Sequence, residues 1–375
     1  MKEFVDGLVS IVVPVYNSEA HLADALDCLV RQSYDNIEVL IVDDGSKDDS
    51  RAICEKYVAC DERFRYIWQK NTGAGAARNH GMDLARGEYL MFLDADDLFE
   101  FELVARLKAA IERDGSDVAV CRADWFKGQY EPDESRLLND GSSIKVGTFR
   151  PVDFADEFYQ VATSYPWDKI YRAAHIRDNN LQYQNLRYSN DNYFVLMSLL
   201  TANRITWIED ILVHYRIGQG GSLRDKMYLD PLCDLDMFDA LRSAVAKSDA
   251  AHASGLMKSL DAFTVDLLFV NYATLASQSV EACKKFHKRL TRFCFPAWEK
   301  LESSKLQCGS FKSKIRLWAL GSVQPDSMAW AVKPFGKNGM RTAGPKQWHI
   351  LYARLLPSML FGRSVGKERR SANDN

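Results

Sequence analysis

Short apolar runs alternate with segments of helical periodicity over the first 125 residues of the chain. The run Val9–Val15 is continuous and rich in β-branched residues, which is typical of a strand buried on both faces of a sheet. Further strands are expected at Glu38–Val42, Phe64–Trp68, Tyr89–Leu93 and Asp117–Cys121. Helices are expected at Ser18–Gln32, with Ser18 as N-cap, and at Ser50–Ala59, Ala74–Ala85 and Glu102–Glu112. This alternation predicts an α/β fold, in which helices cover both faces of a mostly parallel sheet.

The pattern is less regular after residue 125. Residues 126–150 are polar and contain glycine, which indicates a loop or a hairpin. Beyond them we expect helices at 152–161 and 191–202, a strand and turn near Trp167–Tyr171, and a strand at Ile205–Tyr215. From about residue 228 the periodicity predicts mainly helices, at Leu232–Ala246, Leu256–Ala276 and Glu281–Phe293. The longest uncharged stretch, Leu267–Val280, is shorter than the roughly 20 residues that a membrane-spanning helix needs, so none is expected.

The composition is that of an ordinary folded protein. Of the 375 residues, 47% are hydrophobic and 26% are charged, which argues against a disordered chain, a collagen-like repeat or a disulfide-rich mini-protein. This length predicts two domains, or one large domain with an appendage. The eight cysteines form no C-x-x-C pair, and the N-terminal segment is acidic and lacks a signal-peptide cleavage site. We therefore expect a cytoplasmic protein with reduced thiols.

The near-zero net charge of −3 hides an uneven distribution along the chain. Residues 281–375 contain 19 Lys and Arg against 6 Asp and Glu, a net charge of +13, so that residues 1–280 carry −16. A basic tail on an acidic body points to contact with an anionic surface.

Carboxylates cluster directly after two of the predicted strands, in the segments Asp43–Ser46 and Asp94–Asp97. In an open α/β sheet, ligands bind beyond the carboxyl ends of the strands. Clustered carboxylates are costly unless a cation offsets them, and oxygen ligands suit Mg²⁺ or Mn²⁺. Asp94 and Asp96 also fall on the same side of an extended chain. The alternative is that these aspartates form turns and cap helices.

Four segments together resemble the family 2 glycosyltransferases of the GT-A fold. They are Val9–Asn17 (VSIVVPVYN), Val39–Ser46 (VLIVDDGS), Asn71–Gly81 (NTGAGAARNHG) and Gly87–Asp97 (GEYLMFLDADD). The resemblance is strong over residues 9–125 and weaker to about 222. It implies a catalytic domain at 1–225, with a nucleotide-sugar half at 1–125 and an acceptor half at 126–225. Residues 226–375 lie beyond it and are expected to form a helical, basic C-terminal region.

The resemblance assigns the nucleotide pocket to the ends of the first strands. It implies that Pro14 and Tyr16 line the pocket, with Tyr16 against the base. Asp44 would accept the imide N–H of uracil, a contact that selects a uridine donor, and Arg78 would help to hold the nucleotide. The alternative interpretations are that Tyr16 is a packing residue and that Arg78 forms a surface ion pair.

The same resemblance implies a metal site for Mn²⁺ or Mg²⁺. Asp96 would be the direct ligand, and Asp94 would contact the ribose or complete the metal shell. His214 is a further candidate ligand, and Arg216 would hold the diphosphate. A lone histidine at a strand end also suits a purely structural hydrogen bond.

The acceptor half is expected to supply the general base, because the base and the leaving group lie on opposite sides of the anomeric carbon. The segment around Asp191 is similar to the family motif that carries this base, although Asn190 stands where the family usually has Glu. The alternative is that Asp191 only interacts favourably with the helix dipole. The resemblance also places Trp167 and Lys169 against the acceptor sugar, whereas a tryptophan by itself is more often a core residue.

These assignments predict an inverting, metal-dependent glycosyltransferase. The donor would be a nucleotide sugar, in particular a UDP-sugar, and the acceptor a saccharide or lipid-linked oligosaccharide of cell-surface polysaccharide synthesis. A sugar nucleotidyltransferase and a non-catalytic scaffold that binds a nucleotide sugar are the alternatives. The segment Gly73–Arg78 begins like a dinucleotide fingerprint, but it follows the third strand and lacks the last glycine, which argues against a dehydrogenase.

Two stretches of the basic tail combine apolar and basic residues, Glu281–Phe293 and Trp348–Phe361. Such stretches suit the interface of an anionic membrane, which predicts peripheral binding at the cytoplasmic face of the inner membrane. The alternative is a helix that packs on the protein with its lysines in solvent. No recognised nucleic-acid-binding motif accompanies the charge, so nucleic acid is not an expected partner.

Overall fold

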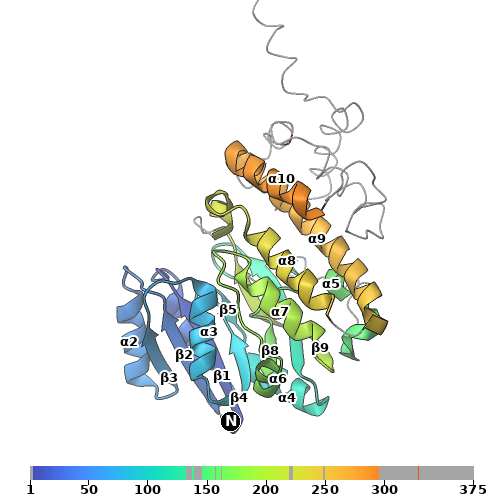
Figure 1. The fold of residues 1–375 in the computed structure, drawn as a ribbon. Coiled ribbons are helices and arrows are strands. Elements are labelled where there is room, and N and C mark those ends of the chain that lie inside the picture. The colour runs from blue at the N-terminus through green and yellow to red at the C-terminus, as the bar shows by residue number, and fades with distance from the viewer. Residues whose placement is uncertain are drawn as a thin grey trace, which may run out of the picture. The chain divides into compact units, whose positions relative to one another are not determined.

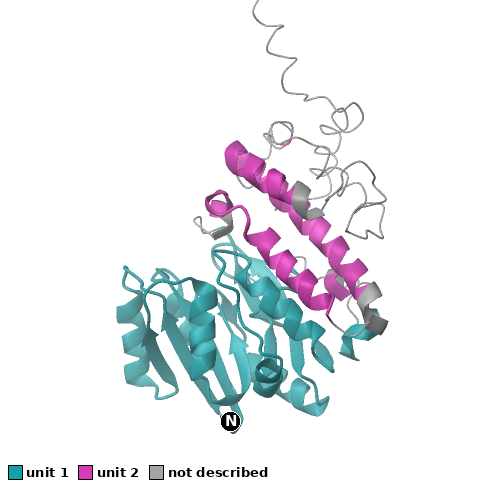
Figure 2. Cartoon of the chain, in the orientation of Figure 1, with its two compact units in different colours: residues 1–154, 161–219 teal, residues 155–160, 220–375 magenta. Residues whose placement is uncertain are grey.

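The computed structural model describes residues 3–131, 137–138, 146–156, 158–161, 163–218, 223–247, 250–294 and Met328. The chain forms two compact units (Figure 2). Unit 1 comprises residues 1–154 and 161–219, and unit 2 comprises residues 155–160 and 220–375. The units therefore divide at residue 219, and unit 2 also takes a short segment from within the predicted acceptor half. The division of function at residue 225 stays a prediction.

Unit 1 is built on one mixed sheet (Figure 1). Its first part is parallel, in the order β3-β2-β1-β4, as the alternation of apolar runs predicted. These strands are β1 (Val5–Val15), β2 (Ile37–Asp43), β3 (Phe64–Trp68) and β4 (Gly87–Phe92). Each of β1, β2 and β4 is largely buried along its length, because helices cover both faces.

The sheet continues beyond β4 with β8 (Lys169–Arg172), which is antiparallel to both β4 and β6 (Val118–Phe126). Next comes β9 (Ile205–Arg216), which is parallel to β6. The short strands β5 (Leu98–Phe99) and β7 (Gly147–Phe149) both pair antiparallel with β9. Strands β1, β2, β3, β4, β6 and β9 thus run in one direction. Their carboxyl ends meet at one edge of the sheet, called the carboxyl edge below.

Helices lie on both faces of the parallel part. One face contributes Val9, Ile11 and Val13 to a core that includes residues of α1 (Leu22–Val30) and α4 (Leu103–Arg113). On the other face, α3 (Ala74–Leu84) crosses β1 and β2 (Figure 1). A Cβ at Gly81 would lie 2.4 Å from Val12 Cγ1, so only glycine allows α3 this close approach to β1. The remaining helices of unit 1 are α2 (Ser50–Cys60), the 3₁₀-helix η2 (Pro151–Phe154), α6 (Ala173–Asp178) and α7 (Asn190–Leu200).

The predicted N-cap at Ser18 is wrong. Helix α1 begins at Leu22, and its N-cap position is His21, without a side-chain capping bond. The segment before it packs on the loop after β2 and on the start of α2: the Glu19 N–H donates to Asp48 Oδ2, and the Ser18 N–H donates to Oγ of Ser50, the first residue of α2. The backbone of residues 18–21 is therefore held by a neighbouring loop and does not extend the helix.

The described residues of unit 2 form mainly helices, as the periodicity predicted. It contains η3 (Leu223–Leu229), α8 (Cys233–Val245), α9 (Ala250–Gln278) and α10 (Val280–Cys294), and α5 (Phe158–Val161) begins within it. Buried polar pairs join α8 to α9. Asn271 Nδ2 donates to Asp234 Oδ2 at 2.6 Å, and Arg242 forms an ion pair with the fully buried Asp261.

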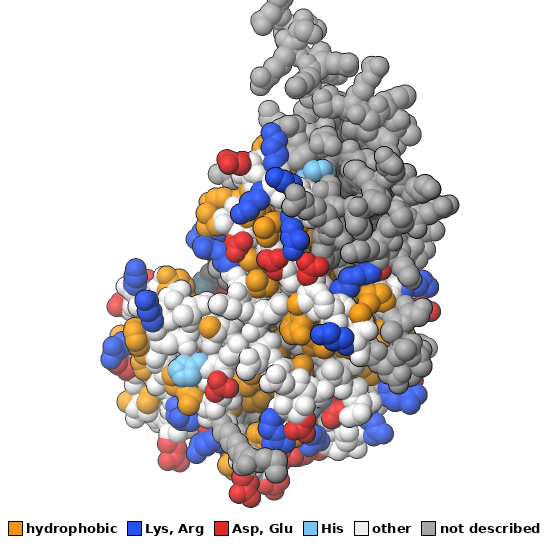
Figure 3. Space-filling model, viewed as in Figure 1, with side chains coloured by type: hydrophobic (Ala, Val, Ile, Leu, Met, Phe, Trp, Pro, Cys, Tyr) orange, Lys and Arg blue, Asp and Glu red, His pale blue; other side chains and the backbone are white. Residues whose placement is uncertain are grey.

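The predicted membrane-binding face of Glu281–Phe293 is packed inside unit 2. On α10, Cys283, Phe286 and Leu290 are fully buried, and the Phe286 ring stacks on Tyr272 of α9 at 6.1 Å. Arg289 is paired with Asp239 of α8 at 3.0 Å. Figure 3 accordingly shows basic and acidic side chains close together on the visible face of this unit. Among the described side chains of this stretch, the apolar face is packed within unit 2, which favours the packing alternative.

None of the helices in the described part of the chain is both long and apolar enough to cross a membrane. The second predicted membrane-binding stretch, Trp348–Phe361, lies outside the described residues.

Candidate active site

The end of β1 supplies the predicted nucleotide-pocket residues Pro14 and Tyr16. Pairing of β1 with β4 ends at Val12 and Phe92, so Pro14 lies just past that ladder, where its missing N–H breaks no strand pairing with β4. Tyr16 is 49% exposed, and the packing alternative is therefore wrong for it. Asn17 turns the chain with a φ of 51°, and its backbone N–H donates to Ser46 Oγ, which ties the loops after β1 and β2 together.

The two aspartates after β2 differ in their roles. Asp43 is buried and accepts hydrogen bonds from Ser46 N at 2.8 Å and from the Tyr66 hydroxyl at 2.6 Å. It is a turn former, as the alternative interpretation held. Asp44 instead accepts bonds from the loop after β3: Oδ1 from Gln69 Nε2 and Thr72 N, and Oδ2 from Gly73 N, each at 2.8 Å.

A carboxylate can accept about four hydrogen bonds. The three N–H bonds to Asp44 leave a position on Oδ2, which accepts only from Gly73 among these donors. The close approach of the two loops depends on Gly45, which has a φ of 76° and whose Cβ would lie 3.1 Å from Asn71 N. Gln69 and Thr72 were not predicted as site residues. Both follow a strand of the same edge, and Thr72 also lies within the segment Asn71–Gly81.

Arg78 joins the two halves of unit 1. It lies on α3, is buried, and donates from Nη2 to Asp94 Oδ1 at 2.6 Å and from Nη1 to Asn190 Oδ1 at 3.2 Å. Its guanidinium also lies over the Tyr183 ring, 5.4 Å from the centroid. Burial alone would lower the pKa of Arg78, but the charge of Asp94 raises it, so the guanidinium stays protonated. Arg78 is therefore not the surface ion pair of the alternative interpretation.

Three aspartates follow β4 at the carboxyl edge. Asp96 is open to solvent on one side, yet burial by the surrounding protein atoms and the charge of Asp94 raise its pKa to about 6. Asp97 is fully buried: its Oδ1 accepts from Arg216 N at 2.9 Å, while its Oδ2 has no hydrogen-bond partner. Burial, then the charges of Asp96 and Asp94, raise the pKa of Asp97 well above its usual range.

These carboxylates fit a magnesium or manganese site that is completed by a substrate. In the described residues, no group of three or more His, Cys, Asp or Glu side chains is arranged to hold a metal ion by itself. Mg²⁺ commonly takes one or two carboxylates, with phosphate oxygens and water as the other ligands. Asp96 and Asp94 have that chemistry, and a cation beside them would offset the charge of Asp94, which adds to burial in raising the pKa of Asp96.

His214 does not fit the predicted metal shell. It is buried, its Nδ1 lies 2.7 Å from Asp124 Oδ1, and its Nε2 lies 3.0 Å from Glu100 Oε1. The Tyr130 ring covers the imidazole, with the ring centroids 4.0 Å apart. Both ring nitrogens are thus engaged by carboxylate oxygens, which leaves neither free to bind a metal ion. The structural interpretation of this histidine is correct.

Arg216 lies beside the acidic segment that follows β4. Its Nε donates to the Asp96 carbonyl oxygen at 2.8 Å, and its Nη2 donates to Asp24 Oδ2 at 3.1 Å. The guanidinium also lies over the Phe126 ring, 4.7 Å from the centroid. The structure therefore gives Arg216 a role in holding the turn that carries Asp96, which the sequence did not indicate. Its contact with a diphosphate stays a prediction.

The two predicted acceptor residues are buried in unit 1. Trp167 is 2% exposed and stacks between Tyr165 and Tyr215, at 4.7 and 5.7 Å between ring centroids. Lys169 is fully buried, and its Nζ bonds to Thr163 Oγ1, the Tyr165 carbonyl oxygen and Asp168 Oδ1. Because neither side chain reaches solvent, the prediction that they contact the acceptor is wrong.

Asp191, the predicted base, lies in the first turn of α7 and is half-buried. The N–H of Asn192 donates to Asp191 Oδ1 at 2.9 Å, and the preceding Ser189 turns the chain with a φ of 56°. The Asp191 charge contributes to the raised pKa of Arg78, so the two side chains lie within electrostatic reach. Asn190, at the place of the family's usual Glu, is buried against α3: a Cβ at Gly75 would lie 3.2 Å from the Asn190 Cβ.

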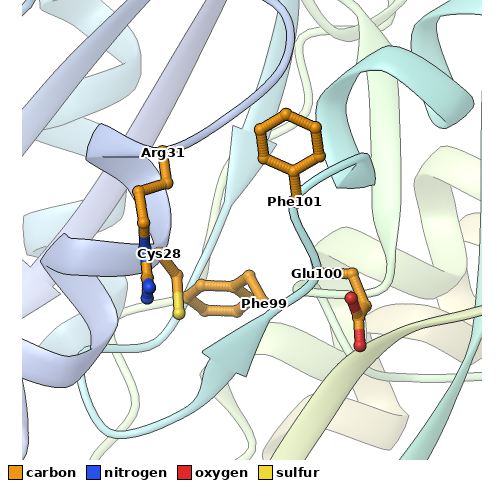
Figure 4. A pocket seen from close by; sticks show the side chains of 5 residues that line it. All are labelled: Cys28, Arg31, Phe99, Glu100 and Phe101. Carbon is orange, nitrogen blue, oxygen red and sulfur yellow. The ribbon is translucent and has the colours of Figure 1, made fainter.

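A pocket elsewhere in unit 1 is lined by Cys28, Arg31, Phe99, Glu100 and Phe101 (Figure 4). It lies between the end of α1 and the segment at β5. None of the predicted nucleotide, metal or catalytic residues lines it, so it is separate from the carboxyl edge.

The mixed sheet and its acidic carboxyl edge are those of a GT-A fold. The chain matches the family described as Glycosyl transferase family 2 over residues 10–178. It is 30% identical to glycosyltransferase GlyG of Streptococcus pneumoniae, over 59% of this chain and 75% of GlyG. The chain belongs to glycosyltransferase family 2.

Other relatives extend well beyond the shared region. The chain is 31% identical to the putative glycosyltransferase EpsH of Bacillus subtilis, over 56% of this chain and 60% of EpsH. It is 32% identical to glycosyltransferase GlyA of Streptococcus pneumoniae, over 59% of this chain and 32% of GlyA. The alignments thus span less than two thirds of these two proteins. Residues 1–349 of Staphylococcus aureus TarS, solved in complex with UDP-GlcNAc, superpose with a TM-score of 0.59 at 21% identity, covering 88% of this chain and 89% of that one. This likeness confirms the predicted GT-A fold.

Proposed function

We propose that the chain is an inverting glycosyltransferase that moves a sugar from a UDP-sugar to a saccharide or lipid-linked acceptor. The observation that carries the proposal is the Arg78 bridge. One guanidinium binds Asp94, at the end of β4, and Asn190, the neighbour of Asp191 on α7. The buried Arg78 thus connects Asp94, the proposed donor-binding carboxylate, to the start of α7, which carries the candidate base Asp191.

The donor part of the proposal rests on the residues after β1 and β2. Tyr16 offers an exposed ring for the base, and Asp44 has an acceptor position for the imide N–H of uracil. The TarS fragment of similar fold was solved with UDP-GlcNAc and with UDP, which supports a uridine donor. The sugar part would extend from the diphosphate toward Asp191.

In the proposed reaction, Asp191 accepts the proton of the acceptor hydroxyl while that oxygen bonds to the anomeric carbon. The bond from the anomeric carbon to the diphosphate oxygen breaks, and UDP leaves with the bonding electrons. Attack from the face opposite the leaving group inverts the configuration. Asp96 and Asp94 would hold a divalent cation, whose charge offsets that of the departing diphosphate. Arg78 keeps Asp94 in place, and Arg216 holds the turn that carries Asp96.

The proposal is tested by UDP release from a panel of UDP-sugars, with and without saccharide acceptors. We expect release that requires Mn²⁺ or Mg²⁺, stops with EDTA and resumes when the cation is restored. UDP binding without any turnover would favour the non-catalytic scaffold, for which Asn190 in place of Glu is the one supporting feature. Pyrophosphate release from UTP and a sugar phosphate would favour a nucleotidyltransferase.

For the acceptor side, we also propose contact with an anionic membrane surface at the cytoplasmic face of the inner membrane. The support is the sequence of Trp348–Phe361, an apolar stretch with aromatic residues that is followed by basic residues. Deletion of residues 340–375 is expected to release the protein from anionic vesicles in a sedimentation assay. Equal sedimentation of the full and the shortened chain would contradict this.

A further inference from the structure

A series of hydrogen-bonded side chains connects α3 to Asp44, the carboxylate that is proposed to recognise the base. His80 Nδ1 lies 2.8 Å from Gln69 Oε1, and Gln69 Nε2 donates to Asp44 Oδ1, also at 2.8 Å. Gln69 Nε2 donates in addition to Thr72 Oγ1 at 2.9 Å. The backbone of Gln69 is fixed as well, since its N–H donates to the Asp43 carbonyl oxygen. Gln69 lies outside the sequence motifs that indicated the nucleotide pocket, whereas Asp44, Thr72 and His80 lie within them.

The chemistry of Asp44 determines the direction of each hydrogen bond in this series. An ionised carboxylate only accepts hydrogen bonds, so the Gln69 amide must turn its NH₂ group toward Asp44. The carbonyl oxygen of Gln69 then faces His80, and Nδ1 of His80 must carry the hydrogen. A reversed amide would place two oxygens against each other at Asp44. His80 thus holds Gln69 in the only orientation that supports the carboxylate.

Base recognition depends on a fixed position of the Asp44 carboxylate. Gln69 and Thr72 occupy Oδ1 of Asp44, which leaves the open acceptor position on Oδ2. If Gln69 turned or moved away, the carboxylate would lose one of its three N–H donors, and the position of Oδ2 would no longer be fixed from that side. A uracil imide needs a fixed acceptor, whereas cytosine presents a lone pair at the same ring position and is repelled by it.

We propose that His80 is a positioning residue that acts through Gln69 to orient Asp44, and thereby sets the preference of the site for uracil over cytosine. The inference rests on the proposed function, because it requires a uridine nucleotide at the carboxyl edge. Neither His80 nor Gln69 contacts the reacting atoms. Their loss should therefore change binding and base selectivity and leave turnover of the bound donor nearly unaltered.

The test uses the full chain and measures dissociation constants for UDP and CDP in the presence of Mn²⁺. His80→Leu removes the N–H donor, whereas His80→Asn keeps an N–H near the place of Nδ1. We expect His80→Leu to weaken UDP binding about five- to tenfold, which corresponds to one ordinary hydrogen bond. The ratio of CDP to UDP dissociation constants should fall toward one, kcat should stay within about twofold, and His80→Asn should restore most of the preference.

Asp44→Asn separates failure of this inference from failure of the proposed site. If Asp44→Asn lowers the preference for UDP but His80→Leu does not, the positioning role is wrong and the nucleotide site stands. If Asp44→Asn leaves the preference unchanged, the uridine site itself is wrong and the inference falls with it. If His80→Asn behaves like His80→Leu, the N–H is not the feature that matters, and the inference is also overturned. Should His80→Leu fail to fold, Gln69→Met removes the same bond from its other end.

Discussion

The carboxyl edge of β1, β2 and β4 differs from the segment 163–172 in how its aromatic and charged residues are exposed and paired. At the edge, Tyr16 and Asp96 are open to solvent, and the carboxylates repel each other. In the segment 163–172, Trp167 and Lys169 are enclosed, and the charge of Lys169 is neutralised by Asp168. In each place an aromatic and a charged residue suggested a ligand site. Those of the segment 163–172 are enclosed and stabilise the fold, whereas those at the edge are open to solvent, as the proposed function requires.

This difference predicts how mutations in the two regions affect stability and donor binding. A residue that serves only to bind a ligand can be replaced with little loss of stability. A buried partner of an ion pair cannot, because its removal leaves an uncompensated charge in a low-dielectric interior. Stability and donor binding should therefore respond in opposite ways in the two regions.

The largest stability effect is expected for Lys169→Met. It leaves Asp168 buried without its cation, at a cost of about 3–5 kcal/mol in the free energy of unfolding. Urea denaturation measures this, with the exposed Lys127→Met as a matched control that should change stability by less than about 0.5 kcal/mol. A Lys169→Met protein of normal stability with a raised acceptor KM would restore the acceptor role of Lys169.

A smaller effect is expected for His214→Leu. Asp124 and Glu100 each lose a hydrogen bond, and the buried Asp124 then keeps the Tyr130 hydroxyl as a partner at 3.2 Å. We expect a loss of about 1.5–3 kcal/mol of stability. Titration calorimetry with Mn²⁺ and UDP should show unchanged metal affinity. A large fall in that affinity would indicate that His214 binds the metal ion.

The pKa of Asp96 predicts a dependence of stability on pH. Its pKa is raised from 3.8 to about 6 in the folded state, so its contribution to stability is fully present below about pH 4 and is lost as the pH rises through 6. Thermal unfolding of the metal-free protein should show this decline, and Asp96→Asn should reduce it. Mn²⁺ at pH 7.5 should raise the Tm of the unmodified protein but not that of Asp96→Asn. A Tm insensitive to Mn²⁺ in both would count against a metal site at Asp96.

The smallest change in stability is expected for Tyr16→Ala. The ring is exposed, so the free energy of unfolding should change by less than about 0.5 kcal/mol. A stack between a base and an aromatic ring is worth about 1–3 kcal/mol, so UDP binding should weaken by at least about fivefold. The exposed Phe101→Ala, a residue away from the carboxyl edge, provides the comparison and should leave UDP binding unchanged. Equal UDP binding by Tyr16→Ala would contradict its place against the base.

The sequence predicted the parallel part of the fold well, because buried strands leave a strong signal. The segments Val9–Val15 and Val39–Val42 are mainly apolar, and both lie in strands that are covered on two faces. The carboxylates that follow such runs had to lie at one edge, because parallel strands end there together. Asp44, Asp94 and Asp96 could thus be placed from spacing alone.

The burial of Trp167 and Lys169 could not be predicted in the same way. Their exposure depends on residues far away in the sequence, such as Tyr215, which covers one side of the indole. Nothing in the local sequence distinguishes an enclosed Asp-Lys pair from an exposed one. Likewise, the partners of His214 come from two other strands or turns, at Glu100 and Asp124, and only the sheet topology brings them together.

The central claim is that Asp191, held beside the Arg78 bridge, is the base of a UDP-sugar transfer. It is tested most directly by Asp191→Asn, with Asp178→Asn, on the exposed end of α6, as the control. UDP release from the best donor of the sugar panel and the dissociation constant for UDP are measured together. For Asp191→Asn we expect a fall in kcat of at least about 100-fold with unchanged UDP binding, and for the control normal activity. Transfer at the normal rate by Asp191→Asn would contradict it.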